Sequence, residues 1–529
     1  MKKIWAQPLN LHDHNVYDGE KHVQYERYSV SSRRKHCLWK FNWKESDVET
    51  KLLKKDAEDF QNMYNQMFKD KIAEGDIVAT NFTGNGIKLY GVDNYKETLG
   101  EEFAEKTMEF KPKWLWQHMM KNNIYYIDHH QAHAAHTFFS SGFEDADIFT
   151  IDGGGNSYRS IFIPSQNKEI INVGANLQIG WLWNIMTKLA DFGTLQEGKL
   201  MGLVGYGCFD EKWYACFESM FEEFKIRGGK FWPDPWVFAS LVTTTDWKVN
   251  MAKTLQKFTL DQIEEKIVPL KTSDNLCVAG GVAYNGYMNE FLTKFWKNVY
   301  VCQAPGDEGQ ALGLYMHANY VLNNEIHIPN IYNGDEYEVE DENIFDGLHY
   351  EKIDDFQVIC DTVAKSIANG SIVGWYQGRT ESGNRALGNR SILADPRNPD
   401  IKKIINRKIK FREDFRPFAP SVLIEHYQDW FDTNQPSPHM SRIMPVHKDK
   451  QSVIPGVTHV DGTARIQTVS EESNKRYHQV ISSFYKETGV PMVVNTSFNC
   501  QEPVVETPEN AVNTFKKTGL DILVIGNYL

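Results

Sequence analysis

The sequence predicts an α/β protein whose ligands bind where β-strands end. Two segments carry this prediction: residues 275–292 (NLCVAGGVAYNGYMNEFL) and residues 298–318 (NVYVCQAPGDEGQALGLYMHA) each contain an apolar strand, a glycine turn and a helix. A second α/β unit begins at residues 371–379 (SIVGWYQGR), a strand that ends in glycine. Repeated strand–turn–helix units are typical of α/β proteins, and their ligands lie at the carboxyl ends of the strands.

Other segments predict individual elements. Residues 45–75 are charged, with apolar residues at helical spacing, and residues 210–270 are rich in Trp, Phe and Lys, so both are expected to be helical. Residues 124–130 (IYYIDHH) predict a strand that runs into a helix. Residues 145–164 (DADIFTIDGGGNSYRSIFIP) predict a hairpin with a glycine turn at 153–155.

The domain organisation follows from one acidic stretch. Residues 333–347 (NGDEYEVEDENIFDG) are rich in acidic and turn-forming residues, which is typical of a linker. We therefore predict an N-terminal domain over residues 1–335, a linker over 336–350 and a C-terminal domain over 351–529. The last domain closes with the strand DILVIGNYL, residues 521–529.

Composition limits the class of protein. The chain has 529 residues and a formal net charge of −13, which argues against a surface that binds bulk nucleic acid by neutralising phosphates. No apolar run approaches the roughly 18 residues of a membrane span, and we find no signal peptide at the N-terminus. The seven cysteines are scattered without a C-x-x-C pair, as expected of free thiols. We therefore expect a cytoplasmic protein without a membrane partner.

Four histidines lie close together in residues 127–139 (IDHHQAHAAHTFF). If residues 131–139 are helical, His129 and His133 share a face, because they are four residues apart. An H-x-x-x-H pair can hold one metal ion between two imidazoles, and the zinc-protease version adds a glutamate directly after the first histidine. His130 occupies that place here, which argues against a zinc protease. The alternative to a metal site is a hydrogen-bonded structural cluster.

A carboxylate would complete the metal site. Asp307 lies in a glycine-flanked turn between a strand and a helix. Two histidines and one carboxylate suit Fe²⁺ or a similar divalent ion. Asp152, which follows another strand, can face the ion or a nucleotide. For a carboxylate at such a turn, the alternative is a helix cap.

Two glycine-rich turns indicate a nucleotide site. DGGG (152–155) and AGGVAYN (279–285) lack the P-loop pattern but let phosphates approach backbone N–H groups. With EGKLMGLVGYG (197–207) between them, they favour an actin-like nucleotide-binding fold. Lys199 can offer a cation to phosphates or be a surface lysine. The predicted nucleotide-binding residues are Asp152, Gly153, Gly154, Lys199, Gly280, Gly281 and Asn285.

Arginines are densest in residues 377–397 (QGRTESGNRALGNRSILADPR), and KFREDFRPFAPS (410–421) and VNTSFN (494–499) follow. Arginines at glycine-rich turns suit bidentate binding of phosphate or carboxylate. A solvated charged face would not carry so much Gly, Pro and Asn beside apolar strands. The predicted anion-binding residues are Arg379, Arg385, Arg390, Lys410, Arg412 and Arg416.

In these motifs the sequence resembles the O-carbamoyltransferase family of nodulation and antibiotic-tailoring enzymes. The resemblance covers nearly the whole chain, and its motifs occur in the family's order. They are DHH-x-AHA (128–134), DG (152–153), K-x-MGL-x-x-YG (199–207), GG-x-A-x-N (280–285), GD-x-G-x-A-x-G (306–313), QGR-x-E-x-G-x-RALGNRSILADPR (377–397), K-x-RE-x-FRPFAPSVL (410–423) and NTSFN (495–499).

The resemblance implies two catalytic domains. The first is similar to the actin-like metal domain of the tRNA threonylcarbamoyladenosine transferases, so iron is expected on His129, His133 and Asp307. The second resembles the YrdC fold. Its K-x-R and S-x-N patterns fall on Lys410, Arg412, Ser497 and Asn499, which adds the last two to the expected anion site.

The resemblance also implies a reaction. The C-terminal domain of the family joins carbamoyl phosphate and ATP, with Mg²⁺, into carbamoyl adenylate. The N-terminal domain then transfers the carbamoyl group to an acceptor hydroxyl. The catalytic candidates are His12 in an abbreviated N-terminal HD motif, His130 and Arg412. Asn384 stands where the family usually has proline, and the NTSFNCQEP loop (495–503) is shorter than usual.

The sequence leaves the acceptor open. It can be a small molecule or a nucleotide, including 5-hydroxymethylcytosine in phage-type DNA, for which RRKH (33–36) offers a local basic patch. Trp213, Trp232, Trp236 and Trp247 can stack on a sugar or base, or pack in the core. The alternatives are a threonylcarbamoyl-type tRNA-modifying enzyme and a non-catalytic actin-like nucleotide-binding protein. A homodimer is compatible with the sequence.

Overall fold

The computed structural model describes residues 3–6, 15–24, 76–80, 123–153, 161–166, 169–170, 177, 179–193, 195–226 and 235–529. Five sequence predictions lie outside these residues: the catalytic candidate His12, Gly154 of the nucleotide site, Trp232, the basic patch at 33–36 and the helix at 45–75.

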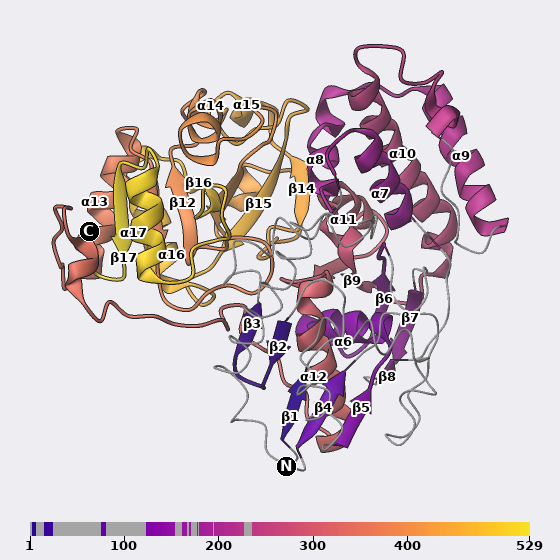
Figure 1. Ribbon diagram of the computed structural model, residues 1–529, viewed down its shortest axis with the longest axis horizontal. Coiled ribbons are helices and arrows are strands. Elements are labelled where there is room, and N and C mark those ends of the chain that lie inside the picture. The colour runs from indigo at the N-terminus through magenta and orange to yellow at the C-terminus, as the bar shows by residue number, and fades with distance from the viewer. Residues whose placement is uncertain are drawn as a thin grey trace, which may run out of the picture.

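Two sheets of the same topology build the N-terminal domain (Figure 1). In each, three strands form an antiparallel meander, and two further strands add in parallel beside the first. The orders are β3-β2-β1-β4-β5 and β8-β7-β6-β9-β10. This repeated topology confirms the predicted two-subdomain, actin-like arrangement. The strands are β1 (Ile4–Ala6), β2 (Asn15–Tyr17), β3 (His22–Gln24), β4 (Ile77–Thr80), β5 (Asn123–Tyr126), β6 (Ala146–Thr150), β7 (Ile161–Gln166), β8 (Glu169–Ile170), β9 (Asn275–Ala279) and β10 (Asn298–Val301).

Two helices pack against each other between these sheets (Figure 1). Helix α6 (His129–Ser141) lies on β6 and β9, and α12 (Gln310–Asn323) lies on β1 and β2. The two helices approach so closely at Gly313 that a Cβ atom there would lie only 1.9 Å from the carbonyl oxygen of Ala132. The remaining helices of the domain are α7 (Ile179–Leu189), α8 (Glu197–Gly202), α9 (Glu211–Ile226), α10 (Trp247–Lys266) and α11 (Gly286–Leu292).

The C-terminal domain is the second α/β unit that the sequence predicts. Its mixed sheet has the order β14-β15-β13-β16-β12-β11-β17, and the final strand pairs in parallel with β11. The strands are β11 (Val373–Tyr376), β12 (Arg390–Ala394), β13 (Ala419–Leu423), β14 (Arg442–Pro445), β15 (Thr463–Val469), β16 (Met492–Ser497) and β17 (Ile522–Ile525). The helices are α13 (Phe356–Ala368), α14 (Ile401–Ile405), α15 (Lys448–Gln451), α16 (Lys475–Thr488) and α17 (Pro508–Lys517).

Helix α11 and strand β14 join the two domains (Figure 1). The Asn289 side chain donates to the Ser441 carbonyl at 2.7 Å. A buried guanidinium, Arg442, lies 3.6 Å from the Glu290 carboxylate across the same boundary. Phe345, inside the predicted linker, is buried in the core of the C-terminal domain. The exact domain boundaries stay a prediction.

The aromatic region around residues 210–260 forms part of a hydrophobic core. Helices α9 and α10 lie in this region, which the sequence predicts to be helical. Trp213 is only 1% exposed and stacks on Phe238 and Trp247, with ring centroids 6.1 and 6.2 Å apart. The core alternative is therefore confirmed for Trp213, whereas Trp247 is only partly buried against this core, and its contact with the acceptor stays a prediction. Within the described ranges, no helix combines the length and apolar character needed to cross a membrane.

Candidate metal centre and anion pocket

The start of α6 positions the histidine pair. The Asp128 side chain caps the helix by accepting from the backbone N–H of His130 at 2.9 Å. The helix begins at His129, two residues earlier than predicted, and this places His129 and His133 one turn apart on one face. Both rings are 1% exposed. A fixed helix end therefore holds both imidazoles in place.

Two carboxylates from distant segments meet these histidines. Asp152 follows β6, and Asp307 follows β10 at the start of a short 3-10 turn (Asp307–Gly309). The His129 Nε2 atom lies 3.0 Å from Asp152 Oδ2 and 3.3 Å from Asp307 Oδ1. The His133 Nε2 atom lies 3.3 Å from each of these oxygens. The potential ligand atoms of all four residues lie within 4.8 Å of one another, so Asp152 joins the predicted set of three.

The predicted nucleotide-binding glycines hold Asp152 in this position. Its Oδ1 atom accepts from the backbone N–H of Gly153 at 2.7 Å and of Gly281 at 3.3 Å, which leaves Oδ2 for the histidines. Gly280 has a φ of +94°, and a Cβ atom there would lie 2.2 Å from the Ile151 carbonyl oxygen. Only glycine fits that crossing, which brings the ends of β6 and β9 together. Binding of a nucleotide by these glycines stays a prediction.

The cluster has the electrostatics of a cation site. Burial opposes ionisation of Asp152, but hydrogen bonds from His129 and His133 outweigh it and hold the pKa of this carboxyl well below its usual range. Burial likewise lowers the pKa of His133, but Asp152 and Asp307 raise it overall to about 9. Two imidazole nitrogens and two carboxylate oxygens suit a divalent transition metal. The residues present therefore fit a metal such as iron.

Three other predicted residues lie outside the cluster. His130, a catalytic candidate, is 0% exposed, and its Nδ1 atom lies 3.1 Å from the Thr150 hydroxyl on β6. The Asn285 side chain caps α11 and donates to Gln256, and its contact with a nucleotide stays a prediction. Lys199 forms an ion pair with Glu413 of the C-terminal domain at 3.1 Å. It therefore lies at the domain interface.

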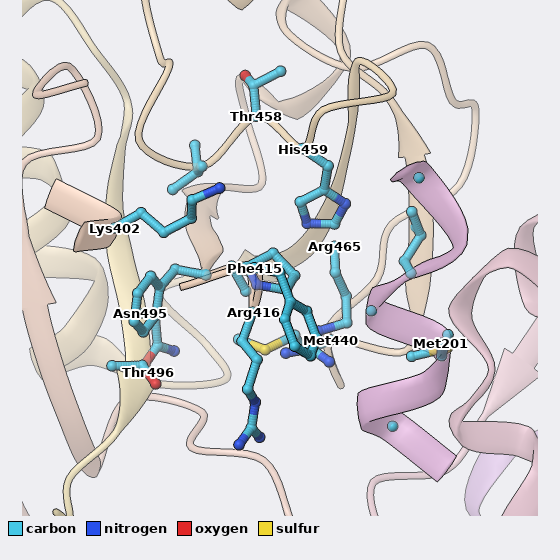
Figure 2. A pocket seen from close by; sticks show the side chains of 18 of the residues that line it. Met201, Lys402, Phe415, Arg416, Met440, Thr458, His459, Arg465, Asn495 and Thr496 are labelled. Carbon is cyan, nitrogen blue, oxygen red and sulfur yellow. The ribbon is translucent and has the colours of Figure 1, made fainter. Parts of the chain in front are cut away.

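A pocket lies where the C-terminal domain meets α8. Arg385, Arg412 and Arg416, three of the predicted anion ligands, line it together with Arg465 from β15. The N-terminal domain contributes Gly198, Met201, Tyr206 and Tyr287, among others. Figure 2 shows Arg416 and Arg465 beside Phe415, Met440 and Asn495. Neither domain forms this pocket alone.

The pocket is strongly cationic. Burial and then Arg416 lower the pKa of Arg412 to about 9. Burial and then Arg385, Arg412 and Arg416 lower the pKa of Arg465 well below its usual range. Among the described residues that line the pocket, none is an aspartate or a glutamate. Four guanidinium groups that repel one another are suited to a ligand with several negative charges.

The other predicted anion ligands have different contacts. Arg379 lies at the surface, with its Nε atom 3.9 Å from Glu336. Arg390 is fully buried, and its Nη1 atom donates to the carbonyl oxygens of Gln377, Gly378 and Asn389. Its role as an anion ligand stays a prediction. The structure does bring together the K-x-R and S-x-N patterns. The Lys410 amine donates to the Asn499 side-chain oxygen at 2.6 Å and to the Ser497 hydroxyl at 3.3 Å, and Ser497 lines the pocket.

The sequence analysis missed several residues of the pocket. Arg465 and His459 lie in HVDGTARIQTV (459–469), which combines an Asp-Gly turn with a strand. Its polar residues Thr463, Arg465 and Gln467 alternate with apolar ones, a pattern that indicates a strand with one polar face. That pattern was available from the sequence, whereas the contribution of α8 depends on domain docking.

One polar contact links the two sites. The Tyr284 hydroxyl donates to Glu308, the residue after the metal-site Asp307, and lies 2.8 Å from the side-chain oxygen of Asn384. The Arg385 guanidinium lies over the Tyr284 ring, 5.1 Å from its centroid. Asn384 thus uses a side-chain contact that proline, the usual residue in the family it resembles, cannot make.

Replacing Tyr284 by Phe is expected to destabilise the protein by about 1–3 kcal/mol, because it removes a hydroxyl donor from the buried carboxylate of Glu308. The midpoint of urea unfolding measures this effect. Tyr206→Phe is the matched control: its hydroxyl is exposed and only 3.4 Å from the Phe415 carbonyl oxygen, so the change should stay within about 0.5 kcal/mol. Equal midpoints for the two variants would contradict the prediction.

The fold and the two sites define a class of protein: a two-domain α/β protein with a candidate metal centre in one domain and a polyanion pocket at the domain boundary. The family models agree with this class. "Carbamoyltransferase N-terminus" matches residues 18–316, and "Carbamoyltransferase C-terminus" matches residues 364–529. The chain therefore belongs to the carbamoyltransferase family and is an enzyme of this class, so the non-catalytic alternative is wrong.

Similar curated proteins support the assignment. Nodulation protein NolNO of Sinorhizobium fredii is 36% identical over 77% of this chain and 64% of its own length. Nodulation protein NolO of Bradyrhizobium diazoefficiens is 35% identical over 76% of this chain and 78% of its own. The 3'-hydroxymethylcephem-O-carbamoyltransferase of Amycolatopsis lactamdurans is 30% identical over 48% of each chain.

Solved structures are similar only at a low level. The (R)-2-hydroxyglutaryl-CoA dehydratase component A of Acidaminococcus fermentans is 11% identical, with a TM-score of 0.31 over 60% of this chain and 97% of its own. HypF of T. kodakarensis is 12% identical, with a TM-score of 0.28 over 61% of this chain and 48% of its own. TM-scores of this size do not support a comparison of sites.

Proposed function

We propose that the chain is an ATP-dependent O-carbamoyltransferase that works in two half-reactions. In the first, carbamoyl phosphate, ATP and one water give carbamoyl adenylate, pyrophosphate and phosphate. In the second, the carbamoyl group passes to an acceptor hydroxyl and AMP leaves. The observation that carries this proposal is the pocket of four arginines in a carbamoyltransferase, because both substrates of the first half-reaction are polyanions.

The arginine pocket is assigned to the first half-reaction. Arg385, Arg412, Arg416 and Arg465 bind the phosphate groups of carbamoyl phosphate and of ATP with Mg²⁺. An anion between these side chains replaces mutual repulsion with charge-assisted hydrogen bonds. Lys410 does not line the pocket but holds Ser497 at its edge. Arg412 is the candidate that touches the reacting phosphates, as the sequence predicts.

The histidine–aspartate cluster is assigned to the second half-reaction. His129, His133, Asp152 and Asp307 would hold a divalent ion such as Fe²⁺, which supplies Lewis acidity toward the carbamoyl carbonyl. Gly153 and Gly281 orient the Asp152 carboxylate, and the Asp128 cap orients the helix with the histidines. His12 stays our candidate for the general base that takes the proton from the hydroxyl group of the acceptor.

The acceptor is proposed to carry a free hydroxyl. The Amycolatopsis relative is named for a hydroxymethyl acceptor. We propose a hydroxyl on a small molecule or nucleotide, and 5-hydroxymethylcytosine in DNA falls in the same chemical group. The family assignment favours carbamoyl over threonylcarbamoyl transfer to tRNA, because the matching models are those of carbamoyltransferases.

The test is release of pyrophosphate from ATP by the purified protein with and without carbamoyl phosphate. We expect release that depends on carbamoyl phosphate and that Arg412→Ala abolishes. If the wild type releases no pyrophosphate at any acceptor concentration, the proposal is contradicted. Labelled carbamoyl phosphate and a panel of sugar, antibiotic and nucleotide hydroxyls then identify the acceptor class.

A further inference from the structure

His459 lines the arginine pocket from the turn that precedes β15. Figure 2 shows its ring and the amine of Lys402 pointing from opposite sides toward the group of labelled pocket residues. The Nε2 atom of His459 is buried and has no hydrogen-bond partner among the described residues. A buried imidazole nitrogen without a partner is costly unless a ligand uses it.

The hydrogen bonds around His459 fix its tautomer. The Thr463 hydroxyl donates to Asp461 Oδ1 at 2.6 Å, because a carboxylate can only accept. That hydroxyl has one proton, so it accepts from His459 Nδ1, which lies 3.1 Å away. The proton of the neutral ring is therefore on Nδ1, and Nε2 carries a lone pair. The hydrogen bonds from His459 to Thr463 and from Thr463 to Asp461 therefore leave Nε2 of His459 as a proton acceptor at the pocket.

The charges around the ring keep it unprotonated until anions bind. Burial lowers the pKa of His459 to about 4; Asp461 raises it, and Arg465 and Lys402 lower it further. Phosphate groups held by the arginines would raise this pKa again, because an anion favours the imidazolium. The ring is therefore a free base before substrates bind and a stronger base afterwards.

The first half-reaction needs such a base. Carbamoyl phosphate must lose phosphate to give carbamate before the carbamate oxygen can attack the α-phosphorus of ATP and expel pyrophosphate. Water supplies the oxygen, and its proton needs an acceptor. None of the described residues that line the pocket carries a carboxylate. Burial raises the pKa of Tyr206 and of Tyr287, so neither phenol ionises readily.

We propose that His459 is the general base for the attack of water on carbamoyl phosphate. Its Nε2 takes one proton as the water oxygen bonds to the carbonyl carbon and the bond from that carbon to the phosphate oxygen breaks. Phosphate leaves with the second proton of the water, so that carbamate remains. Carbamate then attacks ATP without further help from the ring. This inference rests on the proposed function, since it assigns a residue to the first half-reaction.

The test supplies carbamate directly. Ammonium bicarbonate contains carbamate at equilibrium, so it bypasses the cleavage of carbamoyl phosphate but not the reaction with ATP. We expect His459→Asn to lower pyrophosphate release from carbamoyl phosphate by about 100-fold or more, the usual contribution of a general base. Release from ammonium bicarbonate should change by less than about threefold, because the arginine pocket is intact. His349→Asn, which changes an exposed histidine of the predicted linker, is the control for the substitution.

Thr463→Val provides a second variant in case His459→Asn does not fold. It removes the hydroxyl that orients the ring but keeps a side chain of similar shape, so the same selective loss should appear at about 10-fold. Equal losses with both carbamoyl sources, or no loss with either, would overturn the inference while leaving the proposed function intact. A wild type that releases no pyrophosphate with either source would overturn both.

Discussion

Replacing His133 by Ala is expected to remove the bound metal from the protein and to abolish carbamoyl transfer, while pyrophosphate release by the C-terminal pocket continues. His133 contributes one of four potential ligand atoms within 4.8 Å of one another. Its loss leaves the two carboxylates with a single imidazole. We expect metal affinity to fall by more than about 100-fold, since even the loss of a residue that only orients a metal ligand costs about 10- to 100-fold. Elemental analysis of the purified protein measures the metal content.

The structure offers a matched control on the same helix. His136→Asn changes a histidine whose Nδ1 atom lies 3.5 Å from Cys302 Sγ, outside the four-residue cluster, so the metal should be retained. Asp152→Asn tests the ligand for which the sequence left both a metal role and a nucleotide role open, and it should lose metal as His133→Ala does. A His133→Ala protein with full metal content would contradict the assignment of the site.

The sequence could predict the histidine pair but only part of its carboxylates. Spacing along one helix is local information, so His129 and His133 followed from their separation of four residues. Asp152 and Asp307 lie 155 residues apart and meet because β6 and β10 end at the same edge of a sheet. Which atom of Asp152 faces the histidines depends on the N–H groups of Gly153 and Gly281, and no sequence pattern records that choice.

The arginine-rich segments show the same limit. Arg385 and Arg390 are five residues apart in one motif, yet the first lines the pocket and the second is buried at the start of β12. The two side chains differ in their contacts, because Nη1 of Arg390 donates to three carbonyl oxygens of its own loop. Arg465 has no arginine-rich neighbourhood in the sequence and enters the pocket only through the order of strands. The arginine-rich composition of these segments thus predicted an anion site, but it could not predict which arginines line that site.

Replacing Arg465 by Met is expected to abolish pyrophosphate release and, at the same time, to raise the unfolding temperature of the ligand-free protein. The Arg465 guanidinium faces three other arginines, and its Nε atom has no hydrogen-bond partner among the described residues. Removing a poorly compensated charge from such a site is expected to stabilise the protein by about 1–2 kcal/mol. The same change should lower pyrophosphate release by about 100-fold, because the substrate phosphates lose a buried charged partner.

Ligand-dependent unfolding separates this account from simple damage to the fold. Phosphate stabilises a native state that binds it, so it should raise the unfolding temperature of the wild type and leave that of Arg465→Met nearly unchanged. Arg407→Met is the control: its guanidinium is exposed and paired with Asp414 at 2.7 Å, so neither stability nor activity should change much. A lower unfolding temperature for ligand-free Arg465→Met would contradict the repulsion among the arginines. The opposite signs of the two effects follow from one cause, because the charges that bind the polyanionic substrates repel one another when no substrate separates them.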